Sequence, residues 1–247
     1  MKYSILFPVK DQSELILKNL KDVVIPFFDE QNIDYEILVC LDGSSKEQLQ
    51  IFNDGVKALP KEIILTPYMD KKGKGHNVNR LIECCNGDYC LFMDADMATD
   101  LSVFPLMTKD IGKYTCYIGS RNQKGSIYEK KQTLMRQMMH FVSRKLIRYK
   151  FHLKGVRDTQ CGFKMFKSDV AKLMITKQTI DGFAFDVEYL YFLSLNGYTI
   201  KEYPVIWKDN PASTISNGIN EAKRFVKQLK LIKKNKKNYI LKEEEKI

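Results

Sequence analysis

Two aspartates that flank an alanine carry the sharpest chemical signal in the sequence. Asp94-Ala95-Asp96 directly follows an apolar run over 89–93, which has the pattern of a buried strand, and precedes a helix predicted to begin near residue 100. A turn at this point would bring both carboxylates to a common point. Hard divalent cations such as Mg²⁺ or Mn²⁺ take one or two carboxylates together with substrate phosphates. The triplet therefore indicates either a metal site or acids that cap the next helix, and alone it favours neither.

Further polar residues follow apolar runs or precede predicted helices. Asp42 follows the run 37–41, and Arg121 follows the run 117–119. Lys72-Gly73-Lys74-Gly75 lies where a helix is predicted to begin. Its glycines allow close backbone approach, and lysines at a helix N-terminus favour an anion. The spacing is not that of a P-loop, so a flexible basic turn is the competing interpretation.

Two later segments combine small polar groups or acids with apolar neighbours. Asp158-Thr159-Gln160-Cys161-Gly162-Phe163 precedes a short predicted strand. Phe185-Asp186-Val187-Glu188 places two acids at the start of an otherwise apolar helix, where they would cap the helix or favour its dipole. The alternative is that Asp186 faces a pocket formed by the other polar loops.

Short β-rich runs alternate with helical stretches, and this alternation must position the polar residues. We predict strands over 3–9, 35–41, 62–66, 89–93 and 115–119, and helices over 13–31, 45–58, 74–86 and 100–112. A mixed part follows, with a strand at 163–166, a helix at 184–196 and a strand at 199–206. The pattern predicts one α/β domain with a mostly parallel sheet covered by helices on both faces. Ligands of such sheets bind beyond the carboxyl ends of the strands.

Composition and charge exclude several classes of protein. A hydrophobic content of 44% excludes wholesale disorder, and the six cysteines lack zinc-ligand spacing, so we expect reduced, mostly buried thiols. The sequence has neither a secretory signal nor 18 consecutive apolar residues. We therefore expect a cytoplasmic protein without a transmembrane segment.

The formal charge of +10 is concentrated in two segments. Residues 128–154 hold eight Lys or Arg and one acid, residues 223–237 hold eight and no acid, and 24 basic and 29 acidic residues remain elsewhere. Both segments are predicted to form basic amphipathic helices. Such a helix either packs its apolar face on the core or settles on an anionic lipid surface. We expect no nucleic-acid partner, because no nucleic-acid-binding motif accompanies the charge.

Eight motifs, taken together and in chain order, resemble glycosyltransferase family 2. The closest likeness is the branch that transfers a sugar from a nucleotide to a polyprenyl (dolichyl-type) phosphate. The motifs are Phe7-Pro8-Val9, Leu41-Asp42-Gly43-Ser44, Lys72-Gly73-Lys74-Gly75, Asp94-Ala95-Asp96 with Thr99-Asp100, Gly119-Ser120-Arg121, Asp158 to Lys164, Phe185-Asp186-Val187-Glu188, and Glu202-Tyr203-Pro204-Val205 with Trp207.

The resemblance implies a GT-A fold, a Rossmann-like α/β architecture with a nucleotide-sugar half at 1–122 and an acceptor half at 123–220. Residues 221–247 would then form a basic helical tail. It implies an enzyme that uses Mg²⁺ or Mn²⁺ and inverts the anomeric centre. The favoured donor is UDP-glucose, with GDP-mannose as the alternative, and the acceptor is a polyprenyl phosphate at the cytosolic face of an anionic membrane.

The resemblance also assigns roles to individual residues. For the nucleotide sugar it implies Pro8, Asp42, Lys74, Asp94 and Arg121. Asp94 and Asp96 would be the metal ligands, Arg121 and Arg136 would approach the acceptor phosphate, and Asp158 or Asp186 would be the catalytic carboxylate near the reacting centre.

Three departures from the family pattern concern base and acceptor contacts. Leu41 stands where relatives commonly carry an acid, the opening Pro8 to Gln12 lacks their tyrosine, and Ala212-Ser213-Thr214 replaces a Gly-Ser-Lys motif. Two alternatives stay open from the sequence. One is a family 2 enzyme that acts on a soluble saccharide or a cell-wall polymer. The other is a non-catalytic protein that binds nucleotides or nucleic acid.

Overall fold

A seven-stranded sheet forms the centre of the computed structural model, which describes residues 1–41, 43–65, 72–129, 144–208 and 218–247. The strand order is β3-β2-β1-β4-β7-β5-β8. All neighbouring strands are parallel except β7, which is antiparallel to both β4 and β5. The strand bounds are β1 (Lys2–Val9), β2 (Asp34–Leu41), β3 (Ile63–Leu65), β4 (Tyr89–Met93), β5 (Cys116–Ser120), β7 (Phe163–Lys167) and β8 (Ile200–Pro204). The prediction of a mostly parallel sheet is confirmed.

The strand order reverses at β1. From β1 the chain moves to β2 and β3 on one side and then returns to β4 on the other side. In doubly wound sheets, ligands bind in the crevice beyond the carboxyl ends of the strands at such a reversal. The end of β1 and the end of β4 are therefore the expected place for a ligand, and the aspartate pair follows β4 directly.

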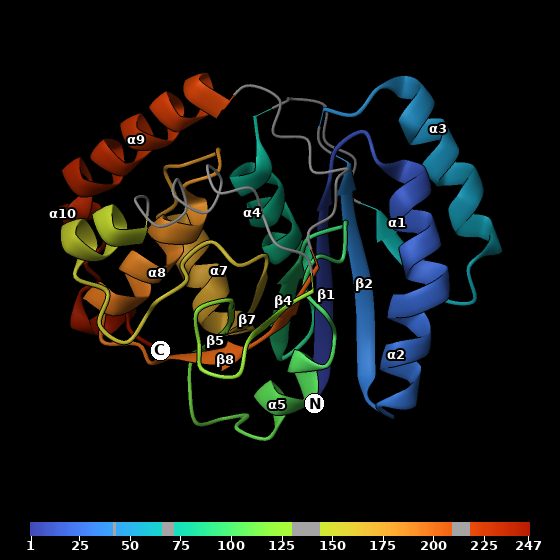
Figure 1. Cartoon of the computed structure of the whole chain (residues 1–247), viewed down its shortest axis with the longest axis horizontal. Helices are drawn as coiled ribbons and strands as arrows, with labels where there is room; N and C mark the ends of the chain where they lie inside the picture. The colour runs from blue at the N-terminus through green and yellow to red at the C-terminus, as the bar shows by residue number, and fades with distance from the viewer. Residues whose placement is uncertain (42, 66–71, 130–143, 209–217) are drawn as a thin grey trace.

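Helices cover both faces of the sheet (Figure 1), and the side chains of β1 show why. Leu6 belongs to one buried apolar cluster, with residues of α4 and α8, whereas Ile5 and Phe7 belong to the other, with residues of α1 and α2. Successive side chains of a strand point to opposite faces, so an apolar run buries both. The helices are α1 (Ser13–Asn19), a π-helical turn (Leu20–Val24), α2 (Ile25–Glu30), α3 (Lys46–Gly55), α4 (Lys74–Cys84), α5 (Val103–Thr108), α7 (Ser168–Thr176), α8 (Phe185–Leu195), α9 (Gly218–Lys234) and α10 (Lys236–Tyr239).

Short elements complete the part of the chain that the structure describes. They are a second sheet of β6 (Ile127–Tyr128) and β9 (Ile206–Trp207), and 3₁₀ turns at Val56–Ala58 and Glu243–Glu245. The predicted strand at 199–206 is thus divided between β8 and β9. The predicted helix at 100–112 is shorter, because α5 begins at Val103.

The two basic segments are helical where the structure describes them. Residues 144–151 are helical, whereas residues 130–143 lie outside the described part. In α9, Leu229 and Ile232 are buried in the same apolar cluster as α8, and most of its basic side chains are exposed. Among the described residues, no helix is both long and apolar enough to cross a membrane. Five of the six cysteines are buried and Cys84 is half-buried, as expected for thiols in a core.

Candidate active site

The turn after β4 places two carboxylates at the edge of the sheet. The main-chain N–H of Met97 donates to the carbonyl oxygen of Asp94 at 3.1 Å, and Met97 adopts a φ of 53°. Asp96 Oδ1 accepts the main-chain N–H of Ala98 at 3.1 Å. Because α5 begins only at Val103, Asp96 closes this local turn and does not cap that helix.

Gly162 leaves the space that the Asp94 side chain occupies. The main-chain N–H of Asp94 donates to the carbonyl oxygen of Gly162 at 3.0 Å. A Cβ atom at position 162 would lie 1.9 Å from Asp94 Oδ2. A side chain at position 162 would therefore displace the Asp94 carboxylate from this place. The glycine of the 158–163 motif therefore has a direct role in placing the first aspartate.

Lys74, the first residue of α4, reaches the same carboxylate. Its Nζ atom lies 2.5 Å from Asp94 Oδ1, with the side chains 26% and 31% exposed. Burial lowers the pKa of Lys74, but Asp94, Asp186 and Asp96 together outweigh this effect, so that the pKa lies above its ordinary value. Lys74 is therefore a charged lysine among three acids, in a segment for which the sequence allowed either an anion site or a flexible basic turn.

The glycines beside Lys74 are required by close packing against the segment before α8. Gly73 has a φ of 131°, and a Cβ atom there would lie 2.6 Å from the carbonyl oxygen of Asp181. At Gly75 a Cβ atom would lie 2.6 Å from the carbonyl oxygen of Ile180. The Lys-Gly-Lys-Gly motif is thus a packed turn. Its backbone is held by the 180–182 segment, and this fixes the start of α4.

Arg121 and Asp158 form a buried ion pair with two parallel hydrogen bonds. Arg121 Nε donates to Asp158 Oδ2 at 2.7 Å, Nη2 donates to Oδ1 at 2.8 Å, and the main-chain N–H of Arg121 donates to Oδ2 at 2.9 Å. Asp158 has no exposed surface. Burial raises the pKa of Asp158, but Arg121 more than compensates, so that the pKa falls to about 2. A carboxylate with this pKa is a weak proton acceptor near neutral pH.

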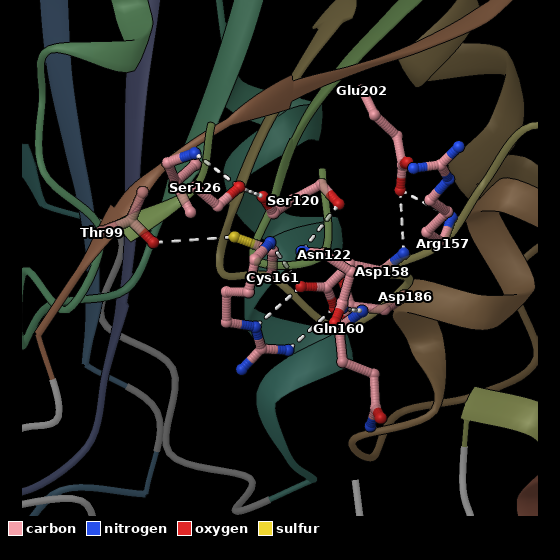
Figure 2. A network of polar contacts seen from close by, with 12 residues as sticks. Thr99, Ser120, Asn122, Ser126, Arg157, Asp158, Gln160, Cys161, Asp186 and Glu202 are labelled. Carbon is pink, nitrogen blue, oxygen red and sulfur yellow. Dashed lines mark hydrogen bonds and ion pairs between the residues drawn. The ribbon is translucent and has the colours of Figure 1, made fainter. Parts of the chain in front are cut away.

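Glu202 of β8 holds the main chain at Asp158 from the other side. Its Oε1 atom accepts the main-chain N–H groups of Arg157 and Asp158 at 2.7 and 2.8 Å (Figure 2). Arg121 in turn lies 5.7 Å from the ring centre of Trp207, within the range of a cation–π contact. The Glu202 to Trp207 motif thus supports both members of the ion pair.

A second buried ion pair joins β7 to the start of α8. Lys164 has no exposed surface, and its Nζ atom donates to Asp186 Oδ1 at 2.6 Å and to the carbonyl oxygen of Cys161 at 2.5 Å. Burial raises the pKa of Asp186, while Lys164 and then Lys74 oppose the rise. Asp186 therefore faces the charged cluster, as the less conventional of the two sequence interpretations proposed.

The predicted residues lie largely at one edge of the sheet. The charged cluster contains Lys74, Asp94, Asp96 and Asp186, and the pair of Arg121 and Asp158 follows at the end of β5. Pro8 lies near the carboxyl end of β1, opposite Cys40 of β2. Asp42 and Arg136 lie outside the described residues.

No role was predicted for Lys164 or Glu202, although both lie in motifs that resemble those of the family. Each is buried and each contacts a predicted site residue. The available signal was a charged residue inside a strand expected to be buried, since such a residue needs a partner of opposite charge or several hydrogen bonds.

The donor set suits a hard cation whose shell is completed by a substrate. Asp94 and Asp96 offer carboxylate oxygens within a single turn, which matches the one or two carboxylates that Mg²⁺ usually takes. Among the described residues, no group of three or more His, Cys, Asp or Glu side chains forms a site complete in itself. An ion held here would need further oxygens, such as those of a diphosphate.

Solved structures with a similar fold contain nucleotides and Mn²⁺. Glucosyl-3-phosphoglycerate synthase from Mycobacterium tuberculosis, in complex with Mn²⁺, uridine diphosphate and phosphoglyceric acid, gives a TM-score of 0.63 at 14% identity, covering 98% of this chain and 80% of that chain. A mannosyltransferase from Pyrobaculum calidifontis, in complex with GDP-Man and Mn²⁺, gives 0.58 at 15% identity, covering 97% and 65%. At these identities the likeness concerns the fold alone. The sheet, its covering helices and these neighbours define a GT-A type α/β protein.

Sequence comparison identifies the family. Residues 4–173 match Glycosyl transferase family 2, so the chain belongs to this family of glycosyltransferases. It is 29% identical over 243 residues to a dolichyl-phosphate beta-glucosyltransferase of Dictyostelium discoideum, covering 91% of this chain and 72% of that protein. A protein of the same name from Saccharomyces cerevisiae is 25% identical over 246 residues, covering 93% and 73%. The predicted family and fold class are confirmed.

Proposed function

We propose that the protein transfers glucose from UDP-glucose to a polyprenyl phosphate, with inversion at the anomeric carbon. The observation that carries this proposal is the cluster of Lys74 and the Asp94-Ala95-Asp96 turn at the reversal of strand order. The names of the two relatives, which match more than nine-tenths of this chain, support glucose as the sugar and a dolichyl-type phosphate as the acceptor. The alternative donor is GDP-mannose, and the alternative acceptor is a soluble saccharide.

In this proposal the cluster binds the diphosphate of the donor. Asp94 and Asp96 would hold Mg²⁺ or Mn²⁺, which supplies charge neutralisation to the diphosphate as it leaves. Lys74 adds a fixed positive charge beside the same carboxylate. Groups that are already in place where negative charge develops stabilise the transition state without reorganisation. The packed glycine turn keeps Lys74 in such a position.

The acceptor half would use Arg121 to bind the acceptor phosphate. Its Nε and Nη2 atoms donate to Asp158, and the remaining guanidinium N–H groups provide donors for a phosphate oxygen. Asp158 would orient Arg121, because its pKa of about 2 makes it a poor base. A phosphate monoester, with a second pKa of about 6, is ionised near neutral pH and needs no general base. A sugar hydroxyl would need one, so this carboxylate favours the phosphate acceptor.

We propose that the basic helices contact the anionic cytosolic face of a membrane. The helical residues 144–151 expose Tyr149, which is 82% exposed, and Leu146, and α9 exposes Val226 and Leu231 among its lysines. The inner apolar face of α9 packs on the core, as one of the two alternatives for a basic amphipathic helix predicted. In this proposal the exposed outer face contacts lipid. Each Lys or Arg near an anionic surface contributes about 1 kcal/mol of attraction, screened by salt.

Thermal unfolding with a panel of nucleotide sugars tests the donor. With Mn²⁺ or Mg²⁺ present, we expect UDP-glucose to raise the melting temperature more than GDP-mannose, and more than single-stranded RNA or DNA. A larger shift with GDP-mannose would identify the other donor. A shift with nucleic acid alone would favour the non-catalytic alternative.

Vesicle binding tests the membrane contact. Replacing Lys223, Lys227 and Lys230 of α9 with glutamine removes exposed charge but keeps the buried Leu229 and Ile232 that a truncation would delete. We expect weaker sedimentation with vesicles that contain phosphatidylserine in low salt. The matched control replaces Lys18, Lys21 and Lys46, which lie on α1, the π-helical turn and α3. Equal sedimentation of the two triple variants would contradict the proposal.

A further inference from the structure

The C-terminal segment of the described chain is joined to both ends of α8. Tyr239 of α10 is fully buried, and its hydroxyl donates to Glu188 Oε1 at 2.6 Å in the first turn of α8. At the other end of α8, Asn196 Nδ2 donates to the carbonyl oxygen of Tyr239 at 2.7 Å, and Asn196 Oδ1 accepts the main-chain N–H of Leu241 at 2.8 Å. Figure 1 shows α9 and α10 on the same side of the sheet as α4 and α8. The tail is therefore part of the core around α8.

Glu188 collects hydrogen bonds from the segment that precedes α8. Its Oε1 atom accepts the main-chain N–H and the hydroxyl of Thr179 at 2.8 and 2.6 Å, and its Oε2 atom accepts the main-chain N–H of Ile180 at 3.0 Å. Glu188 is 1% exposed. Burial raises the pKa of Glu188, and the hydrogen bonds from Thr179 and Tyr239 oppose this rise. The carboxylate thus fixes the backbone at 179–180.

The backbone that Glu188 fixes is the backbone against which the Lys74 turn packs. The main-chain N–H of His76 donates to the carbonyl oxygen of Asp181 at 3.2 Å, and Gln178 Nε2 donates to the carbonyl oxygen of Gly75 at 3.0 Å. The carbonyl oxygen of Ile180 occupies the space where a side chain on Gly75 would lie. A shift at 179–181 would therefore move the first turn of α4, which carries Lys74.

Helix α9 supports the same segment at a second point. Gln228 Oε1 accepts the main-chain N–H of Ala184 at 3.1 Å, and a Cβ atom at Gly182 would lie 2.0 Å from Gln228 Nε2. The C-terminal helices therefore hold the segment before α8 at residues 179–180, through Tyr239 and Glu188, and at residues 182–184, through Gln228. Two contacts on one segment fix its orientation as well as its position.

We propose that Glu188, together with Tyr239, is a positioning residue that sets the place of Lys74 in the donor site. The inference rests on the proposed function in one respect, namely that Lys74 contacts the donor diphosphate. The connection runs from Tyr239 to Glu188, through the 179–181 backbone to Gly75 and His76, and so to Lys74 and Asp94. The two acids of the Phe-Asp-Val-Glu motif then have separate tasks, since Asp186 faces the charged cluster and Glu188 holds the loop beside it.

The test compares variants at the two ends of α8. Glu188→Gln places an amide NH₂ against N–H donors, and Tyr239→Phe removes one donor and leaves Glu188 with the other three. Asn196→Ala is the matched control, because it breaks two hydrogen bonds to the same tail at the end of α8 that is remote from Lys74. Initial rates give KM for UDP-glucose, KM for polyprenyl phosphate and kcat, and urea unfolding gives the stability of each variant.

We expect Glu188→Gln to raise KM for UDP-glucose by roughly tenfold and Tyr239→Phe by roughly threefold, with KM for the acceptor unchanged. Asn196→Ala should lose stability and keep the wild-type KM for the donor. The inference is overturned if Asn196→Ala raises the donor KM as much as the other two variants. It is also overturned if Tyr239→Phe and Glu188→Gln both keep the wild-type donor KM and leave the reactivity of the Lys74 amine unchanged.

Brief acylation followed by peptide mass spectrometry separates this inference from the proposed function. Release of Lys74 from its place beside Asp94 should increase labelling of its amine in Glu188→Gln relative to Asn196→Ala, with Lys46 as the internal standard. Increased labelling with an unchanged donor KM would support the positioning role and contradict diphosphate binding by Lys74. Equal labelling in both variants would overturn the positioning role.

Discussion

Replacement of Asp158 by asparagine removes the charge that pairs with Arg121 and keeps the size of the side chain. Asp158 has no exposed surface and accepts Nε and Nη2 of Arg121 at 2.7 and 2.8 Å. Removing one partner of a buried ion pair costs about 3–5 kcal/mol, because the other charge remains in a poorly solvated place. Since Arg121 keeps 12% of its side chain exposed, we expect the lower end, about 3 kcal/mol of unfolding free energy at pH 7.

Part of this loss depends on pH in a defined direction. Burial raises the pKa of Asp158, but Arg121 lowers it from 3.8 to about 2. At about 1.4 kcal/mol per pKa unit, the ionised carboxylate contributes about 2 kcal/mol of stability to the wild type. Because the folded-state pKa lies below the unfolded-state pKa, this contribution is complete above about pH 5, falls to roughly half near pH 3 and is nearly lost at about pH 2.

Urea unfolding measures the unfolding free energies of the wild type and Asp158→Asn. Urea is suitable because it is uncharged and does not screen the ion pair. Trp207, the single tryptophan, lies 5.7 Å from the Arg121 guanidinium and provides the fluorescence signal. The other acids titrate equally in wild type and variant. The difference in unfolding free energy between the two proteins at pH 7, 5 and 3 therefore reports on Asp158 alone. Asp54→Asn, in an exposed pair with Lys57, is the control and should change little. A gap under about 1 kcal/mol at pH 7, or one that does not narrow between pH 5 and 3, would refute the buried pair.

Three further substitutions test the rest of the site. Asp96→Ala should abolish sugar transfer and retain the fold by circular dichroism; full activity in this variant with divalent cations chelated would refute the metal role. Gly162→Ala should displace the Asp94 carboxylate by about 1 Å and lower kcat/KM by roughly 10²-fold, and steady-state kinetics with an unchanged kcat/KM would contradict the packing described above. Lys164→Met leaves Asp186 buried without its partner and should lower the unfolding free energy by about 3–5 kcal/mol; chemical denaturation showing no loss would mean that the two groups do not pair.

The sheet was largely predictable because buried parallel strands are continuous apolar runs. The predicted runs at 3–9, 35–41 and 89–93 match β1, β2 and β4 within one residue at each end. The antiparallel direction of β7 was not predictable, since the composition of a strand does not encode its direction. Helix α7 was missed because it follows β7 without a loop and lacks a side-chain cap at its start.

The site was predictable only where a single segment carried the signal. Asp94 and Asp96 stand out because they follow a strand directly. The contact of Lys74 with Asp94 and the pairing of Arg121 with Asp158 join residues 20 and 37 positions apart, and only the fold shows which charges meet. The close approaches that require Gly73 and Gly162 likewise depend on segments that are distant in the chain.

Transfer of labelled glucose from UDP-glucose to a polyprenyl phosphate in detergent, with Mn²⁺ or Mg²⁺, is the most direct measurement of the proposed function. We predict a product that partitions into organic solvent, requires both the lipid phosphate and a divalent cation, and is not formed by Asp96→Ala. Labelled glucose found only in a water-soluble saccharide, or lipid product formed at the wild-type rate by Asp96→Ala, would contradict it.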